Sequence, residues 1–451
     1  MYSPYFNSLK SNLLMLRIIF FLLLFFSLNT NQSQDLVLGD YVPGNGLVFA
    51  SSDDNYKTVL RGYTQSLFES KSMLFDSVDV LDNNRYNRFR ARRVRLRLSG
   101  NQLSPGFSYR FQVDLAQSDA GDGELSGALL DAWIGYNFNK KIKIIIGQKA
   151  TPTDNIELQM ASNSLQLPER SRLTSAFSSI REVGVFLDGK FKIGNKAVIK
   201  PMLNITNGDG SNTISNDFGG FKYGARLNIL PLGTFRNFGQ FRQVDMVREL
   251  TPKFMIGLNA SYNVGISSRR GRGNGDILYK NDLGEYSLPN YLKFGSDFLL
   301  KFRGFSLIAE FVKTKVYIPN DITQRVRNNG TTSTSFNGDV DNYVKGRMML
   351  GSGLNIQAGY LLKSLYSIDA RFTNLRPDEY SFMNNSAFYN RNKYYTLGLS
   401  KYFFKNYTYK VQASYTYVDD AVIRDKTGIE YQGNENILRL MVQIAFWCKL
   451  G

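Results

Sequence analysis

Polar and apolar side chains alternate in many short stretches of the chain after residue 34. From Arg93 to Leu98, arginines alternate with valine and leucine, and from Phe254 to Val264 every second residue is apolar. A strand sends successive side chains to opposite faces, whereas a helix would distribute both kinds around its circumference. We find no competing helical period of any length. The pattern therefore predicts an all-β protein.

Segments of about ten residues carry this alternation, and we count sixteen of them. They cover 56–68, 86–100, 107–117, 128–138, 141–149, 181–189, 197–206, 220–229, 253–264, 291–301, 304–315, 346–362, 364–373, 393–403, 407–418 and 436–447. A tilted strand of about 9–11 residues crosses a bilayer, so each segment is long enough to span a membrane.

The links between these segments alternate in length. Links after even-numbered segments are nearly all short, such as NFNK and KIGN, and links after odd-numbered segments are nearly all long, such as 150–180 and 316–345. Short turns at one rim and long loops at the other, with an even strand count, are typical of outer-membrane barrels, and a soluble sandwich has no reason to show them. We predict a transmembrane antiparallel β-barrel of about 16 strands. The link 230–252 is an exception, because it is long where a short turn is expected.

A membrane barrel directs its apolar side chains to lipid and its polar side chains to the lumen. Leu96 and Leu98 are therefore predicted to face lipid, while Arg93, Arg95 and Arg97 follow the inner wall about 7 Å apart.

Aromatic side chains at strand ends fit the girdles that such barrels form at the membrane interfaces. Candidates are Tyr136, Phe138, Tyr402, Phe403 and Phe446. Their positions also suit the ordinary preference of aromatic residues for strands.

The first residues indicate a targeting segment. Leu13–Leu28 is apolar apart from Arg17, and polar residues up to Ser33 follow it. This stretch is short for a membrane helix, which needs about 20 residues, so we predict a signal peptide at 1–33 and an outer-membrane barrel at 34–451. Met15 is an alternative start, and an uncleaved anchor helix is the alternative interpretation.

The amino-acid composition limits the kinds of catalytic and metal-binding site that the chain can form. The chain has 55 Lys and Arg against 38 Asp and Glu, a formal charge of +17, no histidine and one cysteine, Cys448. The missing histidine excludes Ser-His-Asp, Cys-His and histidine–metal sites, so we expect no enzyme activity, no metal and no cofactor. The basic balance indicates anionic partners. Arg269, Arg270 and Arg272 are expected to face solvent or lipopolysaccharide, since their Gly-rich stretch lacks the aromatic residues that would indicate nucleic acid.

Several segments together resemble one known family. RRVRLRLSG, LLDAWIGYNF, LPERSRLTSAFSSIREVGVFLDG and ILRLMVQIAF occur in this order. Over nearly the whole mature sequence the chain resembles the phosphate-selective porin O/P family of Gram-negative outer membranes, in a form like those of Bacteroidetes. The resemblance implies a sixteen-stranded barrel, usually a homotrimer, in which a long third loop folds inward. Segment 150–180 occupies the place of that loop. The five residues after Phe446 depart from the family, whose barrels commonly end on phenylalanine.

The resemblance also implies candidate pore-lining residues. Basic side chains line the pore of family members, which places Arg93, Arg95 and Arg97 on the wall. The other candidates are Arg170, Arg172 and Arg181 in or beside the loop, and Arg226 and Lys293 on inward-facing strand positions. The alternative is a structural network in which these cations pair with the lumenal carboxylates Asp114, Asp131, Glu182, Asp297 and Glu310.

The sequence thus predicts a porin for passive diffusion of small anions, with phosphate or polyphosphate as candidate solutes. Guanidinium groups stay charged and offer forked donors to phosphate and carboxylate oxygens. The expected partners are small anions, outer-membrane lipid and lipopolysaccharide, and further copies of the chain in a homotrimer; nucleic acid is not expected. The alternative is a structural or surface-machinery barrel of the outer membrane without solute transport.

Overall fold

The computed structural model describes residues 36–42, 46–51, 53, 55–75, 85–104, 106–116, 129–211, 218–273, 275, 277–385, 391–424 and 430–446. The predicted signal peptide 1–33 and the tail after Phe446 lie outside the described residues.

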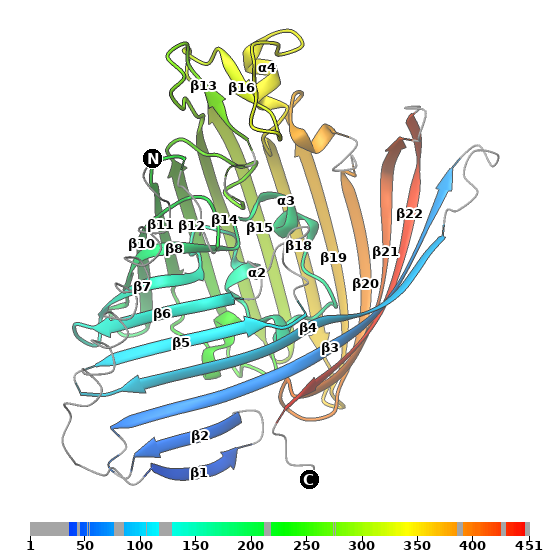
Figure 1. Cartoon of the computed structure of the whole chain (residues 1–451). Helices are drawn as coiled ribbons and strands as arrows, with labels where there is room; N and C mark the ends of the chain where they lie inside the picture. Colours follow the sequence, from blue (N-terminus) through cyan, green and yellow to red (C-terminus); the bar gives the residue numbers. More distant parts are fainter. Residues whose placement is uncertain are drawn as a thin grey trace, which may run out of the picture.

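Sixteen antiparallel strands form a closed barrel, because the last strand pairs with the first barrel strand (Figure 1). The strands are β3 (Tyr56–Phe75), β4 (Arg85–Gln102), β5 (Phe107–Asp114), β6 (Leu129–Asn137), β7 (Ile142–Ala150), β8 (Arg181–Gly189), β10 (Ala197–Thr206), β11 (Lys222–Leu230), β12 (Lys253–Asn263), β14 (Asn290–Phe302), β15 (Phe305–Tyr317), β18 (Gly351–Leu361), β19 (Tyr366–Pro377), β20 (Lys393–Tyr402), β21 (Tyr409–Arg424) and β22 (Glu430–Ala445). The predicted fold class is confirmed, and β8 and β10 have the predicted bounds.

The N-terminal hairpin was not predicted. Strands β1 (Leu36–Val42) and β2 (Gly46–Ser51) pair with each other, and β2 pairs with residues 57–60 of β3. On β3, strand β22 occupies residues 63–75. Strand β2 therefore pairs with the same edge of β3 as β22 does, just beyond the last residue that pairs with β22.

The faces of the strands are those of a membrane barrel. On β12, Ile256 and Leu258 are 37% and 48% exposed on the outer surface, whereas Asn259 and Ser261 are buried inside. One predicted girdle residue lies elsewhere: Tyr402 is completely buried, and it packs in a cluster with Leu361 and Tyr407. Its place on the inner parity of β20 directs the ring away from lipid.

A β-bulge on β4 directs six arginines into the lumen. Arg93 pairs with Gln65 and Ala91 pairs with Ser66, so Arg92 is an extra residue between two paired positions. Without the bulge, strict alternation would turn Arg88 and Arg90 toward lipid. With it, the inward residues are Arg88, Arg90, Arg92, Arg93, Arg95 and Arg97, and Phe89 is 85% exposed on the outside.

Two chain segments fill much of the barrel. Residues 151–180, here called the inward loop, contain α2 (Ile156–Gln159), η2 (Ser162–Ser164) and α3 (Arg172–Phe177), and they lie inside the strands (Figure 1). Residues 231–252, here called the turn-side segment, contain η3 (Arg236–Phe241) and enter from the rim of short turns. No helix in the described part of the chain is long and apolar enough to cross a membrane.

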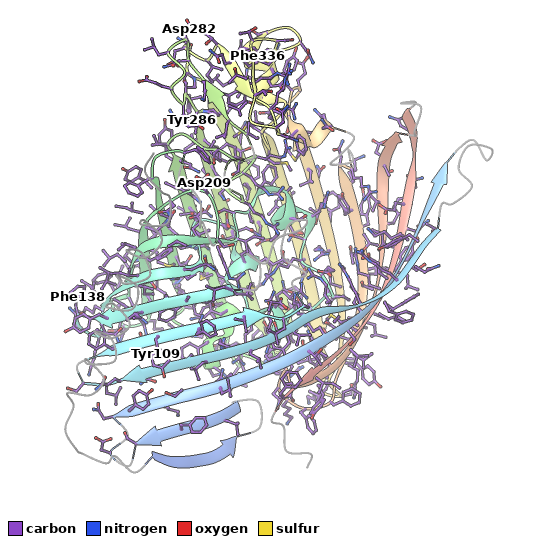
Figure 2. All side chains as sticks on the ribbon, in the orientation of Figure 1. Tyr109, Phe138, Asp209, Asp282, Tyr286 and Phe336 are labelled. Atoms are coloured by element: carbon purple, nitrogen blue, oxygen red, sulfur yellow. The ribbon has the colours of Figure 1, made fainter. Side chains whose placement is uncertain are left out.

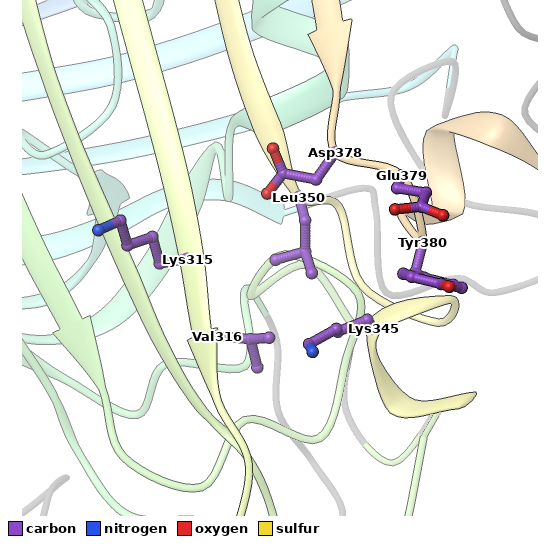
Figure 3. A pocket seen from close by; sticks show the side chains of 7 residues that line it. All are labelled: Lys315, Val316, Lys345, Leu350, Asp378, Glu379 and Tyr380. Atoms are coloured by element: carbon purple, nitrogen blue, oxygen red, sulfur yellow. The ribbon is translucent and has the colours of Figure 1, made fainter. Parts of the chain in front are cut away.

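The long loops build a cap above the opposite rim. Strands β13 (Tyr279–Lys280), β16 (Gln324–Val326) and β17 (Thr332–Ser333) form a small sheet beside α4 (Val340–Lys345), with a hydrophobic core of their own. Figure 2 shows Phe336 in this cap and Phe138 near the other rim. A hollow of about 310 Å³ at its base is lined by Lys315, Lys345, Asp378 and Glu379, among others (Figure 3).

Deleting Arg92 is expected to leave the barrel folded, because the deletion removes the extra residue of the bulge and keeps the alternation of β4, although it also removes one of the three arginines that bind Glu169. Deleting Leu96 shifts the alternation of part of β4 and turns arginines toward lipid, at about 2–4 kcal/mol for each one near the midplane. The heat-modifiable gel mobility of both variants, refolded into lipid vesicles, tests this. Equal folding of the two variants would contradict the role assigned to the bulge.

Candidate functional site

Glu169 of the inward loop binds three arginines of β4. Its carboxylate lies 3.2 Å from Arg93 Nη2 and 3.3 Å from Arg90 Nη2, and it also accepts a hydrogen bond from Arg92 Nη2 at 2.9 Å. Burial alone would raise the pKa of Glu169, but the charges of Arg92 and Arg93 outweigh it and hold that pKa well below its usual range. The charges thus hold the loop against the wall.

Two neighbouring carboxylates bind further arginines of the strands. Arg88 Nη2 lies 2.9 Å from Glu69, which also binds Arg439 of β22 at 2.6 Å. Arg95 Nε lies 2.8 Å from Asp114, and both side chains are buried. Of the predicted wall residues, Arg93 and Arg95 are therefore ion-paired and almost without exposure.

Arg226 and Lys293 also lie in buried ion pairs. Arg226 Nη2 donates to both carboxylate oxygens of Asp297, at 2.6 and 2.8 Å. Lys293 Nζ binds the carboxylate of Asp154 in the inward loop, whose pKa is lowered because the ammonium charge outweighs the effect of burial. The Arg226–Asp297 pair belongs to the structural network that the sequence left as an alternative, whereas Asp154 was not among its predicted carboxylates.

The candidates in or beside the inward loop brace it from within. Arg170 donates to the carbonyl oxygens of Glu157 and Met160, the latter at 2.9 Å. Arg172 is the first residue of α3. Arg181 lies at the start of β8, and its Nε is 3.0 Å from the carboxylate of Asp131 on β6.

Partly exposed cations lie on the other side of the lumen. The inward side chains of β11–β22 are almost all buried against the inward loop and the turn-side segment, whereas several on β3–β10 keep exposure. We call five of these side chains the basic wall: Arg61, Arg97, Arg110, Lys143 and Lys200. The accessible part of the lumen therefore follows β3–β10.

Few carboxylates balance the basic wall. The side chain of Arg110 is 38% exposed and lies 3.6 Å from Asp131. Within the described ranges, Arg97 forms no ion pair, and its Nε lacks a hydrogen-bond partner. Lys143 Nζ stands 4.8 Å from the ring centroid of Trp133. Weakly compensated cations beside an exposed path are what an anion would meet.

The sequence analysis did not single out Arg61, Arg110 or Lys200. Arg110 and Lys200 lie in segments that were predicted as strands, at positions whose parity directs them inward. Parity was therefore a usable signal for these two, but it could not tell a paired cation from an exposed one.

Lysines gather at the rim of short turns. A groove of about 870 Å³ lies between the turns after β6 and β8 and the ends of the turn-side segment. We call it the lysine groove; its lysines are Lys140, Lys141, Lys190, Lys192, Lys196 and Lys253. Among the described residues, none of these six forms an ion pair.

The arginines of the stretch 269–272 are only partly exposed and lie among other long loops. The guanidinium carbon of Arg269 lies 3.8 Å from the ring centroid of Phe382. Burial and the neighbouring charges of Arg272 and Arg172 lower the pKa of Arg270 to about 9. Gly273 N donates to Asp209 O at 3.1 Å, which ties this loop to the link after β10. We call the region of the long loops around Arg269, Arg270 and Arg272 the vestibule, and it is basic.

Comparison with known proteins identifies one matching family and several solved outer-membrane proteins of similar structure. A family model described as phosphate-selective porin O and P matches residues 74–446. A comparison with curated protein sequences finds no match.

The structure is similar to three solved outer-membrane proteins. The outer membrane channel DcaP of Acinetobacter baumannii has 13% identity and a TM-score of 0.46, covering 88% of this chain and 99% of that chain. The trimer form of OmpT of Vibrio cholerae has 11% identity and a TM-score of 0.46, covering 86% and 99%. Salmonella typhi OmpF in complex with daunomycin has 12% identity and a TM-score of 0.46, covering 87% and 99%.

Replacing Glu169→Gln is expected to destabilise the protein by about 3–5 kcal/mol at neutral pH, because three arginines lose their shared counter-charge. The folded pKa of Glu169 is lowered, so its stabilisation is complete above the unfolded value of 4.5 and declines as the pH falls below it. The difference in unfolding free energy between wild type and variant should therefore shrink from pH 7 to pH 3.

Guanidinium unfolding from lipid vesicles at both pH values measures this difference. Glu379→Gln is the matched control, since that exposed carboxylate has no ion pair among the described residues. A Glu169→Gln variant as stable as this control would contradict the anchoring role.

Proposed function

Because the chain belongs to the phosphate-selective porin O and P family, we propose that it is an anion-preferring channel whose path follows the basic wall. The family and the closed barrel make it an outer-membrane channel for small solutes, and this family consists of channel proteins rather than enzymes. The preference for anions, and for phosphate among them, is the proposal.

The observation that carries the proposal is the unequal pairing of the lumenal cations. Arg93, Arg95 and Arg226 are buried against carboxylates and hold the interior together. Arg97 and Lys143 lie on the partly exposed side, and neither forms an ion pair within the described residues. A row of cations with unsatisfied charge attracts anions and repels cations, and exposure keeps the binding weak enough for release.

Basic residues at both rims extend this path. In the vestibule, Arg269, Arg270 and Arg272 lie above the inward loop, where an anion would first enter. At the short-turn rim, the lysine groove offers ammonium groups, which are compact and strongly hydrated charges. We assign capture to the vestibule, selection to the basic wall and release to the lysine groove.

The paired candidates take a different role in this proposal. Arg93, Arg95, Arg226 and Lys293 position the inward loop, and the solute meets Arg97, Arg110 and Lys143 instead. The homotrimer and the contact with lipopolysaccharide stay predictions from the sequence.

Reversal potentials across a planar bilayer in a KCl gradient test the channel. Purified wild-type protein is expected to pass mainly chloride, and added phosphate is expected to reduce that current by competing for the basic wall. The double variant Arg97→Gln, Arg110→Gln should lower the chloride-to-potassium permeability ratio several-fold. The control double variant Lys363→Gln, Lys405→Gln removes two charges from exposed turns after β18 and β20, away from the basic wall, and should leave the ratio unchanged.

Two results would contradict the proposal. A current carried mainly by potassium would refute the preference for anions. Absence of current from protein that is folded by heat-modifiable mobility would refute the channel itself and support the structural barrel.

A further inference from the structure

The turn-side segment joins two adjacent strands by an indirect route. Strands β11 and β12 pair with each other, and the other links at this rim are short turns. Residues 231–252 instead reach the turn between β20 and β21, where Tyr407 donates its hydroxyl to Val244 O at 3.0 Å. They return past the β14–β15 turn, where Arg303 N donates to Glu249 O at 2.9 Å.

One buried lysine fixes the centre of this segment. Lys301 of β14 is 1% exposed, and its Nζ donates to the carbonyl oxygens of Gly239, Arg242 and Val244 at 2.8, 2.8 and 3.0 Å. A single ammonium group thus binds three backbone carbonyls of the segment, two of which also accept hydrogen bonds from the Tyr407 hydroxyl and from Arg242 N. The segment is held as a defined structure and not as a loose turn.

Gln243 connects the segment to the inward loop and to the wall. Its Nε2 donates to Glu157 Oε1 at 3.1 Å, and its Oε1 accepts from Gln166 N at 2.8 Å and from Gln357 Nε2 at 3.1 Å. Phe241 O accepts a further hydrogen bond from the loop backbone. One amide side chain therefore bonds two residues of the inward loop and one residue of β18.

Apolar contacts close the space around these hydrogen bonds. Phe235 lies in one buried cluster with Ile156 and Met160 of the inward loop and with residues of β14 and β15. Val244 lies in a second buried cluster beside Tyr402. Close-packed apolar contacts of this kind help to close the space between the segment and the loop.

We propose that the turn-side segment is a second constriction element, which enters from the short-turn rim and braces the inward loop through Gln243. Together the two segments close the part of the lumen bounded by β11–β22 and confine ions to the basic wall. This inference rests on the proposed channel function and goes beyond it, because it assigns the width and selectivity of the path to a link on the opposite rim from the long loops.

A deletion tests the closure of the lumen. In a variant whose residues 234–249 are replaced by a short glycine-serine turn, β11 and β12 are joined as the other neighbouring strands are. Its single-channel conductance should be about twofold or more above wild type, and its chloride-to-potassium permeability ratio should fall, because ions gain a path away from the basic wall. A folded deletion variant with wild-type conductance and ratio would overturn the proposal.

A single substitution tests the brace without removing the segment. Gln243→Glu places a carboxylate against Glu157, so it should loosen the inward loop. Hydrogen–deuterium exchange of peptides covering 157–166 should become about tenfold faster, while exchange in the barrel strands stays unchanged. Gln324→Glu in the cap makes the same chemical change at a distance and should leave these peptides unaffected. Unchanged exchange in Gln243→Glu would overturn the brace, even if the deletion variant fails to fold.

The two readouts separate this inference from the proposed function. A wild-type protein that carries no current would refute the channel, whereas the exchange result would still decide whether Gln243 holds the loop.

Discussion

The interior of this barrel depends on the contact between one carboxylate, Glu169, and the arginines of β4. Three guanidinium groups on one strand repel each other, and burial makes their charge costly. The carboxylate that compensates them lies on a loop from elsewhere in the sequence. The same pairs therefore allow the arginines to lie inside the barrel and require the loop to fold inward.

This requirement divides the lumen into two parts with different physical character. On the side of β11–β22, buried ion pairs such as Arg226–Asp297 and packed side chains such as Phe235 resemble the core of a soluble domain. On the side of β3–β10, several inward side chains keep partial exposure, and five of them are the cations of the basic wall. The protein thus has a packed interior and a partly exposed basic wall within a single ring of strands.

Alternation along the chain was sufficient to predict the strands, because closure in a membrane leaves only two faces for side chains. Alternation could not predict which of the lumenal cations are ion-paired. Arg93 and Arg97 have the same parity on the same strand, yet Arg93 pairs with Glu169 and Arg97 has no such partner in the described ranges. Which arginine is paired depends on carboxylates brought close by the fold. The bulge at Arg92 and the inward course of the link 231–252, whose unusual length the sequence did reveal, were likewise beyond a local pattern, since both are defined by distant contacts.

The hairpin of β1 and β2 has a consequence for how the ring of strands closes. It occupies residues 57–60 of β3, and β22 begins its pairing at residue 63 on the same edge. If β22 slid toward the short-turn rim during assembly, it would meet β2 almost at once. A strand edge alone permits many offsets, and each even offset keeps the same faces toward lipid and lumen. The hairpin acts as a mechanical stop that excludes the offsets in one direction, so the circumference closes in a defined register.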